Sequence, residues 1–118
     1  MAADFEIEFP EGTDFLWEFT LQDQDAAAID ISAATITFAL FLPSAATNPN
    51  GTAELTYTTA NNVSITDGAA GEGTVDFEAA DTVALAGGYI AELEVVTSLG
   101  KTYSKWGKVK ITPRRLDA

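Results

Sequence analysis

The stretch GYIAELEVVTSLGKTYSKWGKVKI, residues 88–111, decides the fold. Its first half alternates apolar residues with glutamates, and its second half alternates apolar or small residues with polar ones, among them Lys108 and Lys110. The in-phase positions are Tyr89, Ala91, Leu93 and Val95, and then Tyr103, Gly107, Val109 and Ile111. A period of two marks a strand with one buried face, and Ser98-Leu99-Gly100 supplies a turn between the halves. The sequence therefore predicts a long antiparallel hairpin.

The same period recurs outside this hairpin. Further alternating runs are DFEIEF (4–9), DFLWEFTLQD (14–23), ATITFALFL (34–42) and GTVDFEA (73–79), with shorter candidates AELTYT (53–58) and NVSIT (62–66). Clusters of Gly, Pro, Asn and Asp separate the runs. Seven or eight short strands with turns between them predict an all-β fold, an antiparallel β-sandwich.

The phases of these runs also predict which side chains fill the space between the two sheets. The predicted core is Phe5, Ile7, Trp17, Phe19, Ile36, Phe38, Leu40, Phe77, Tyr89, Leu93, Val95, Val109 and Ile111. One stretch, EAADTVALAGG (78–88), favours a short helical crossover of barely two turns that stops at Gly87-Gly88. The 118 residues are expected to form one domain, 1–118, with a basic tail at 113–118.

Composition excludes several functional classes. The chain has no cysteine and no histidine, so disulfides, thiolate metal sites and the usual neutral-pH general base are all missing. The acidic N-terminus MAADFEIEFPEG has no signal-peptide pattern, and no apolar run is long enough to span a membrane. Neither a P-loop nor a G-x-S-x-G motif is present, and we expect no enzymatic activity and no cofactor.

Charge is divided unequally along the chain. Residues 1–100 hold 17 of the 18 acidic residues and no basic one, whereas all six basic residues lie at positions 101–115. Six cations could contact phosphates, but an acidic body so close to them opposes both nucleic acid and anionic lipid. The sequence therefore predicts no nucleic-acid partner and no membrane partner.

The basic residues can interact with two kinds of acidic partner: acids on the neighbouring strand of the same sheet, and an acidic surface of another protein. A hairpin turn near Leu99-Gly100 places Glu94 opposite Ser104 and Glu92 opposite Trp106, with Lys108 diagonal to Glu92. Lys110, Arg114 and Arg115 are then expected at or beyond the strand end. We expect them to dock on an acidic surface of a neighbouring protein, because Pro113 ends the strand before the arginines.

Trp106 and Tyr89 each allow two interpretations. The phase of Trp106 points it outward beside lysines, as at a contact surface, but a β-bulge at Gly107 would turn it into the core. Tyr89 either caps a corner by bonding to backbone upstream or is an ordinary strand tyrosine. The candidate protein interface comprises Trp106, Lys108, Lys110, Arg114 and Arg115.

Acidic residues invite a metal or catalytic interpretation. Asp23, Asp25 and Asp30 have the oxygen chemistry of a calcium loop, but Ala27, Ala28 and Ala34 occupy the positions where an EF-hand needs a ligand, its turn glycine and its glutamate. Glu92 and Glu94 have only the separation that any two alternate strand residues have. We therefore assign no metal site and no catalytic residue.

Several turn and strand motifs occur together in a fixed order. They read Glu11-Gly12-Thr13-Asp14-Phe15, Asp23-Gln24-Asp25, Asp30 to Thr35 (DISAAT), Ala80 to Tyr89 (ADTVALAGGY), Glu92-Leu93-Glu94-Val95 and Trp106 to Ile111 (WGKVKI). In this order the chain resembles small bacteriophage virion and tail proteins with an immunoglobulin-like fold, such as the N-terminal module of baseplate upper proteins. Alanines in DQDAAAID depart from the glycine and proline usual in such loops.

This resemblance implies a structural role in the tail, baseplate or capsid surface. The expected partners are other virion proteins and copies of the chain itself, and the expected location is the virion, assembled in the bacterial host cytoplasm. An alternative is an extracellular or virion-displayed binding module that recognises a carbohydrate or host surface.

Overall fold

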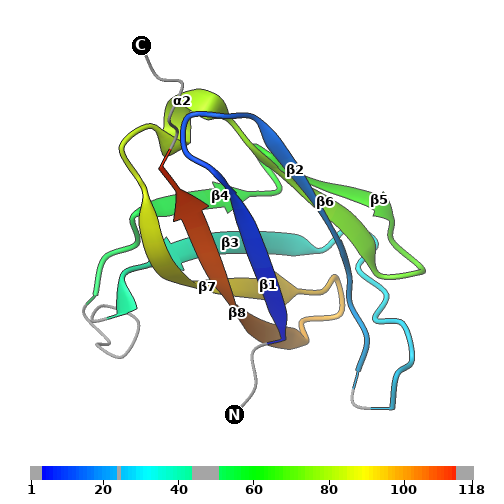
Figure 1. Ribbon diagram of the computed structural model, residues 1–118. Helices are drawn as coiled ribbons and strands as arrows, with labels where there is room; N and C mark the ends of the chain where they lie inside the picture. Colours follow the sequence, from blue (N-terminus) through cyan, green and yellow to red (C-terminus); the bar gives the residue numbers. More distant parts are fainter. Residues whose placement is uncertain (1–3, 24, 44–50, 114–118) are drawn as a thin grey trace.

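Two β-sheets pack face to face in the computed structural model, which describes residues 4–23, 25–43 and 51–113 (Figure 1). One sheet has the strand order β1-β8-β7-β3-β4, and the other has the order β2-β6-β5. The strands are β1 (Phe5–Pro10), β2 (Phe15–Thr20), β3 (Thr35–Phe41), β4 (Leu55–Thr58), β5 (Val63–Asp67), β6 (Glu72–Phe77), β7 (Gly87–Val96) and β8 (Thr102–Thr112). This is an immunoglobulin-like sandwich, in which β3, β7 and β8 correspond to strands C, F and G, and β2, β6 and β5 to strands B, E and D.

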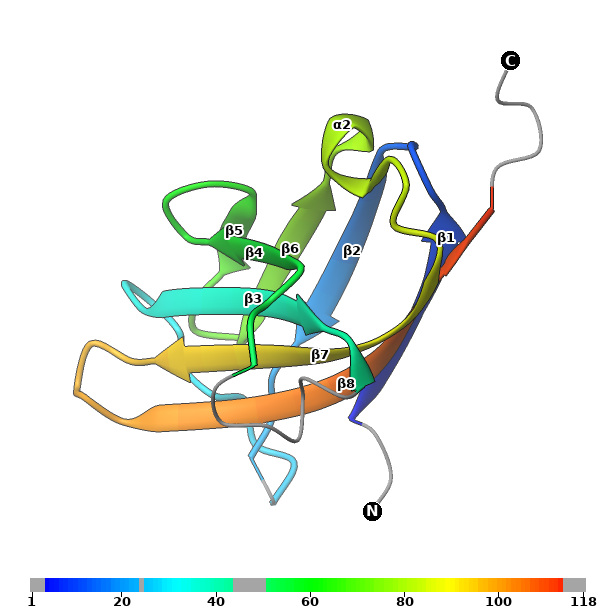
Figure 2. The same ribbon diagram turned by 90° about the vertical axis from the view of Figure 1, so that its left-hand side faces the viewer.

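The hairpin of β7 and β8 confirms the predicted register. Glu94 pairs with Ser104 and Glu92 with Trp106, and the pairing continues without a shift from Gly87 to Val96. The hairpin forms the long central ribbon of the larger sheet (Figure 2). One pairing differs from the antiparallel expectation, because β1 runs parallel to β8. Alternation specifies which face a strand buries, but it does not specify the direction of its neighbour.

The predicted core is confirmed at eleven of its thirteen positions, which are buried. Phe5 and Trp17 are only half-buried, although both pack against the buried cluster. They lie on β1 and β2, the edge strands of the two sheets, where the sandwich is open at the side. Their rings contact each other, with centroids 4.7 Å apart, so this pair joins the two sheets at that side.

The ring of Phe5 lies over Gly107, its register partner on β8. A β-carbon at position 107 would overlap that ring and the Phe5 backbone. The glycine therefore leaves the space that the Phe5 ring occupies between β1 and β8. At the same end, the Asp4 N–H donates to the Trp106 carbonyl and an Asp4 carboxylate oxygen accepts from the Trp106 N–H.

A single helical turn, α2 (Ala79–Thr82), connects β6 to β7 at one end of the sandwich (Figure 1). It is shorter than the expected crossover, and Gly87-Gly88 begins β7 instead of ending a helix. The chain leaves the helical conformation at Val83, and Ala84 is left-handed with φ 65°. The buried Thr82 hydroxyl accepts the Gly12 N–H at 3.0 Å, which ties α2 to the β1–β2 turn.

A tyrosine does fasten this corner, but it is Tyr57 on β4. Its hydroxyl donates to Asp81 at 2.7 Å and accepts from the Glu78 N–H at 3.3 Å. Burial and the hydrogen bond to Asp81 both raise the pKa of Tyr57, so its hydroxyl keeps the proton that it donates. The corner-capping interpretation of Tyr89 is wrong, because within the described residues its hydroxyl makes no backbone hydrogen bond.

Replacing Gly107 with valine tests the packing of Phe5. The new side chain must displace the Phe5 ring, and overpacking of this kind costs about 1–3 kcal/mol. Urea unfolding measures the loss. The matched control is Gly88→Val on the neighbouring strand, where a β-carbon meets no atom within 4 Å. Equal stabilities for the two variants would contradict this account of β1.

Candidate functional site

The outer face of the five-stranded sheet is the side turned away from the three-stranded sheet. Its side chains come from the alternate positions of each strand, those that point away from the core. In register across the sheet, one row reads Glu6, Lys108, Ile90 and Phe41, and the next reads Trp106, Glu92, Ala39 and Thr56. Charged and apolar side chains are therefore mixed across this face.

Lys108 and Lys110 of β8 lie between glutamates of β1 and glutamates of β7. On β1, Glu6 is in register with Lys108 and Glu8 with Lys110. On β7, Glu92 is diagonal to Lys108, as predicted. Opposite charges on neighbouring strands contribute a few tenths of a kcal/mol to about 1 kcal/mol each. The strand lysines thus offset acids within their own sheet.

Lys110 corrects one expectation. It was expected at or beyond the strand end, but β8 continues to Thr112 and Lys110 lies within it. The sequence also did not show that β1 pairs in parallel with β8. This pairing places Glu8 in register with Lys110 and so gives Lys110 an acidic neighbour within the sheet. Arg114 and Arg115 lie outside the described residues.

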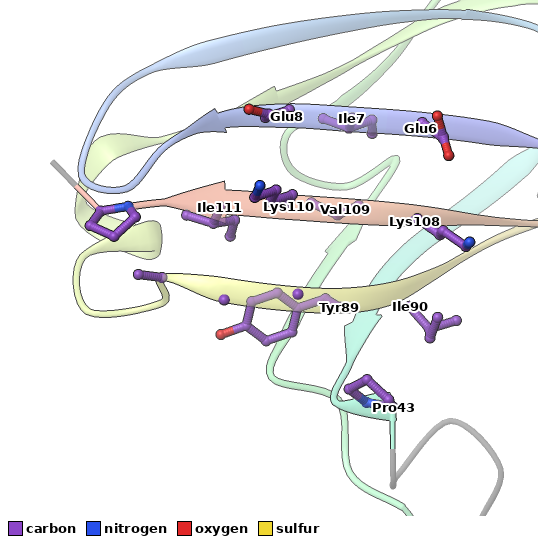
Figure 3. Close-up of a pocket in the computed structure, with 14 residues that line it drawn as sticks. Glu6, Ile7, Glu8, Pro43, Tyr89, Ile90, Lys108, Val109, Lys110 and Ile111 are labelled. Atoms are coloured by element: carbon purple, nitrogen blue, oxygen red, sulfur yellow. The ribbon is translucent and has the colours of Figure 1, made fainter.

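A shallow hollow of about 930 Å³ lies on this face where β7 begins. Gly87 and Gly88 contribute no side chains to it, and Ile90, Tyr89 and Pro43 form its apolar side. Figure 3 shows Glu6, Glu8, Lys108 and Lys110 along the opposite side, on β1 and β8. Two carboxylates and two ammonium groups therefore border an apolar depression without a net charge.

Trp106 points outward, and the bulge that would have turned it inward is absent from β8. Ala91 pairs with Gly107 and Glu92 with Trp106 in an unbroken ladder. Trp106 is half-buried and is not part of the core cluster. A partly exposed indole outside the core is typical of a contact surface.

Sequence reasoning missed the hollow and its apolar side. Ile90 breaks the polar phase of β7 just as Phe41 breaks that of β3, and the two residues are register partners. Two out-of-phase apolar residues on predicted neighbouring strands could have located this patch. Gly87-Gly88 gave no such signal, because glycines there were interpreted as the end of a helix.

Burial also affects Tyr89, which borders the hollow. Removal from water, together with the negative charge of Glu54, raises the pKa of Tyr89. The residue remains neutral at physiological pH, and little of its ring is exposed at the hollow, because Tyr89 is one of the buried core residues.

The aspartates considered for calcium are used by the backbone. One Asp23 carboxylate oxygen accepts from the N–H groups of Asp25 and Ala27, at 2.8 and 3.1 Å. Asp30 accepts from the Ser32 N–H, and this bond and the one to the Ser32 hydroxyl lower the pKa of Asp30. These are side-chain-stabilised turns. Ala26, in the same loop, is left-handed with φ 63°.

Within the described ranges, no three acidic residues come together as metal ligands would. Glu92 and Glu94 project from the outer face beside Ala39 and Thr37, their register partners on β3. No helix of the described chain is both long and apolar enough to cross a bilayer.

Comparison with known proteins gives no family. No family model matches the chain, and no curated protein matches it. Among solved structures, Tim-1 is similar over 100% of both chains, with 14% sequence identity and a TM-score of 0.48. A likeness this low assigns no function.

The exposure of Trp106 can be measured by fluorescence. In a Trp17→Phe variant, Trp106 is the single indole, and we expect red-shifted emission that acrylamide quenches readily. In the matched Trp106→Phe variant, Trp17 reports from among Phe5, Phe19 and Phe38, so its emission should be bluer and less quenchable. Blue, quencher-resistant emission from Trp106 would contradict its outward placement.

Proposed function

We propose that this chain is a non-enzymatic structural protein of a bacteriophage virion, in the tail, the baseplate or the capsid surface, that assembles through protein–protein contacts. Its partners are other virion proteins, copies of this chain among them. The order of sequence motifs supports the phage assignment. The outer face of the five-stranded sheet supports assembly by contact.

The observation that carries the proposal is the composition of that outer face. Trp106, Ile90 and the apolar side of the hollow lie on this face among glutamates and lysines whose charges nearly balance. Tryptophan is among the residues that contribute most to binding at protein interfaces.

The sheet supplies part of the area that such a contact needs. Five strands spaced about 4.8 Å apart, with a rise of about 3.3 Å per residue, give a face of several hundred Å². A stable interface needs about 800 Å² per partner, so the sheet together with an adjoining loop or the tail would meet that requirement.

The absence of histidine and cysteine from the sequence supports a non-enzymatic role. The placement of Glu92 and Glu94 also supports this role, because both project from an open sheet face. Paired catalytic carboxylates need a cleft that excludes water.

The C-terminal arginines complete the proposed attachment. Pro113 is exposed and borders the hollow, and Arg114 and Arg115, which lie outside the described residues, come next in the sequence. Arginine forms bidentate pairs with carboxylates, and the acidic surface of a neighbouring copy offers many of them.

Filling the hollow tests the proposed docking face. A Gly88→Phe side chain would occupy the hollow without meeting any atom within 4 Å of its β-carbon. We expect thermal stability to change by less than about 0.5 kcal/mol and self-association or binding to virion proteins to be lost. Analytical ultracentrifugation and co-purification measure these outcomes. The control is Ser64→Phe, an exposed position on β5 in the other sheet. Normal assembly of Gly88→Phe would exclude this face.

The tail is tested separately with an Arg114→Ala, Arg115→Ala double variant. We expect unchanged stability of the isolated domain and weaker assembly, because the contact is made by charges. In the wild type, raising the salt should weaken assembly in the same way, since exposed pairs are screened over about 8 Å at physiological ionic strength. A double variant that assembles normally, or that unfolds, would assign the contact to the sheet alone.

A further inference from the structure

The turn between β7 and β8 carries the most exposed large apolar side chain of the described residues. Leu99 is 87% exposed, and the next most exposed, Val83, is 59% exposed. A single exposed leucine is common on protein surfaces. Turns favour glycine, proline, asparagine, aspartate and serine, however, so the turn itself does not require leucine at this position. The surroundings of Leu99 therefore decide whether it is a contact residue.

Backbone hydrogen bonds hold this turn in a fixed shape. The Thr97 N–H donates to the Lys101 carbonyl at 2.8 Å, and the Gly100 N–H donates to the Thr97 carbonyl at 2.9 Å. The Thr97 hydroxyl oxygen also accepts from the Lys101 N–H at 3.1 Å, and Gly100 is left-handed with φ 84°. A preformed turn loses little conformational freedom when it binds, so Leu99 is presented at low entropic cost.

The turn projects beyond the neighbouring strands. The pairing of β3 with β7 ends at Thr35 and Val96, and β1 pairs with β8 only from Gly107 onward. Within the described chain, no other strand therefore flanks residues 97–101. Figure 2 shows the turn extending at one end of the larger sheet. Leu99 is thus an apolar side chain at the tip of a projecting hairpin.

The apolar hollow lies at the opposite end of β7, over Gly88. A β-carbon at this glycine would meet no atom within 4 Å, so the space above it is open. Ile90 and Pro43 form the apolar side of this space (Figure 3). The aliphatic stem of Lys110, the register partner of Gly88, borders it on the other side. A leucine side chain placed over Gly88 would be removed from water by these three residues.

The turn cannot enter the hollow of its own molecule. β7 has ten residues, so Leu99 and Gly88 lie at opposite ends of a strand of about 30 Å. The turn can reach such a hollow only on a second molecule. A contact between one end of a molecule and the other end of the next is heterologous. It gives a ring where the rotation closes and a filament where it does not.

Charge complementarity favours a copy of this chain as the occupant. Lys101, two residues after Leu99, is exposed, and no ion pair holds its ammonium group within the described chain. Glu54 is an exposed acid near the hollow, where its N–H donates to the Leu40 carbonyl at 2.7 Å and its charge raises the pKa of Tyr89. Its carboxylate also has no ion pair among the described residues. A turn seated in the hollow therefore meets an acid that its own lysine can pair with.

We propose that the β7–β8 turn of one copy docks into the hollow of the next, with Leu99 over Gly88 and Lys101 beside Glu54. This inference rests on the proposed assembly through the outer face, and it names a second copy of this chain as the partner of the hollow. The contact joins opposite ends of successive molecules, so copies add in one direction. It buries the most exposed apolar side chain of the described residues in the apolar part of the outer face.

Leu99→Ser and Gly88→Phe remove the two halves of this contact separately. Each variant alone should self-associate at least about tenfold more weakly than the wild type, which corresponds to about 1.4 kcal/mol. Sedimentation velocity over a concentration series measures the loss. The matched control is Leu16→Ser, the same substitution at an exposed leucine on β2 in the other sheet, and it should associate as the wild type does. Circular dichroism should show the same fold for all variants.

A mixture of the two variants separates this contact from other modes of association. Leu99→Ser keeps an intact hollow and Gly88→Phe keeps an intact turn, so one contact between them remains possible. We expect a 1:1 complex that does not grow further, because each variant lacks the half that the next contact needs. A contact between two identical faces would not be restored by mixing, since each pair would still contain a filled hollow. Absence of the mixed complex overturns the proposal.

The pairing of Lys101 with Glu54 is tested by exchanging their charges. Lys101→Glu should weaken self-association by about threefold, as expected for an exposed ion pair, and Glu54→Lys should do the same. The double variant restores opposite charges across the contact, so its association should return toward that of the wild type. A double variant that associates no more strongly than the single variants overturns this docking geometry.

Two outcomes overturn the inference and leave the proposed function standing. In the first, Leu99→Ser associates like the wild type while Gly88→Phe does not, so another segment fills the hollow. In the second, the wild type stays monomeric at millimolar concentration but co-purifies with virion proteins. If Gly88→Phe itself assembles normally, the outer face is excluded and both proposals fail.

Discussion

The contact of Phe5 with Gly107 connects the first strand of the protein to the last. Because residue 107 has no side chain, β1 can lie close to β8, and the Phe5 ring extends across the sandwich to Trp17 on the other sheet. The remaining aromatic packing continues from there, through Phe38 and Phe77, to Tyr57 and the α2 corner. The parallel position of β1 also places Glu6 and Glu8 beside the lysines of β8. One glycine therefore determines both how the sheets close and how the basic strand is neutralised.

Much of the fold could be predicted from the sequence, because alternation and turn residues act locally. The β7–β8 register follows from two phased runs and one turn, and most of the core follows from phase alone. The parallel direction of β1 could not be predicted in this way, since an edge strand with one buried face alternates identically in either direction. Tyr57 was missed for a related reason, because its bond to Asp81 joins residues that are 24 positions apart and forms only when the corner closes.

The candidate site was predicted less completely than the fold. The outward phase of Trp106 and Lys108 was correct, but the hollow depends on missing side chains at Gly87 and Gly88. A sequence pattern shows which side chains project from a face, whereas a depression arises where none does. The half-buried state of Trp17 and Lys105 has the same origin, since it depends on where β1 stops along β8. Such features appear only once strand lengths are compared across a sheet.

Charge decides which face of the sandwich can approach another copy. Residues 1–100 contain no basic residue, so the outer face of the β2-β6-β5 sheet has only acids among its charges, including the exposed Glu18, Glu72 and Asp76. Two such faces would repel each other within a Debye length of about 8 Å at physiological ionic strength. On the outer face of the other sheet, lysines of β8 lie between glutamates of β1 and β7, so the local charge is nearly balanced. A second acidic molecule can therefore approach there at the lowest electrostatic cost, and that is also where Trp106 and the apolar hollow lie.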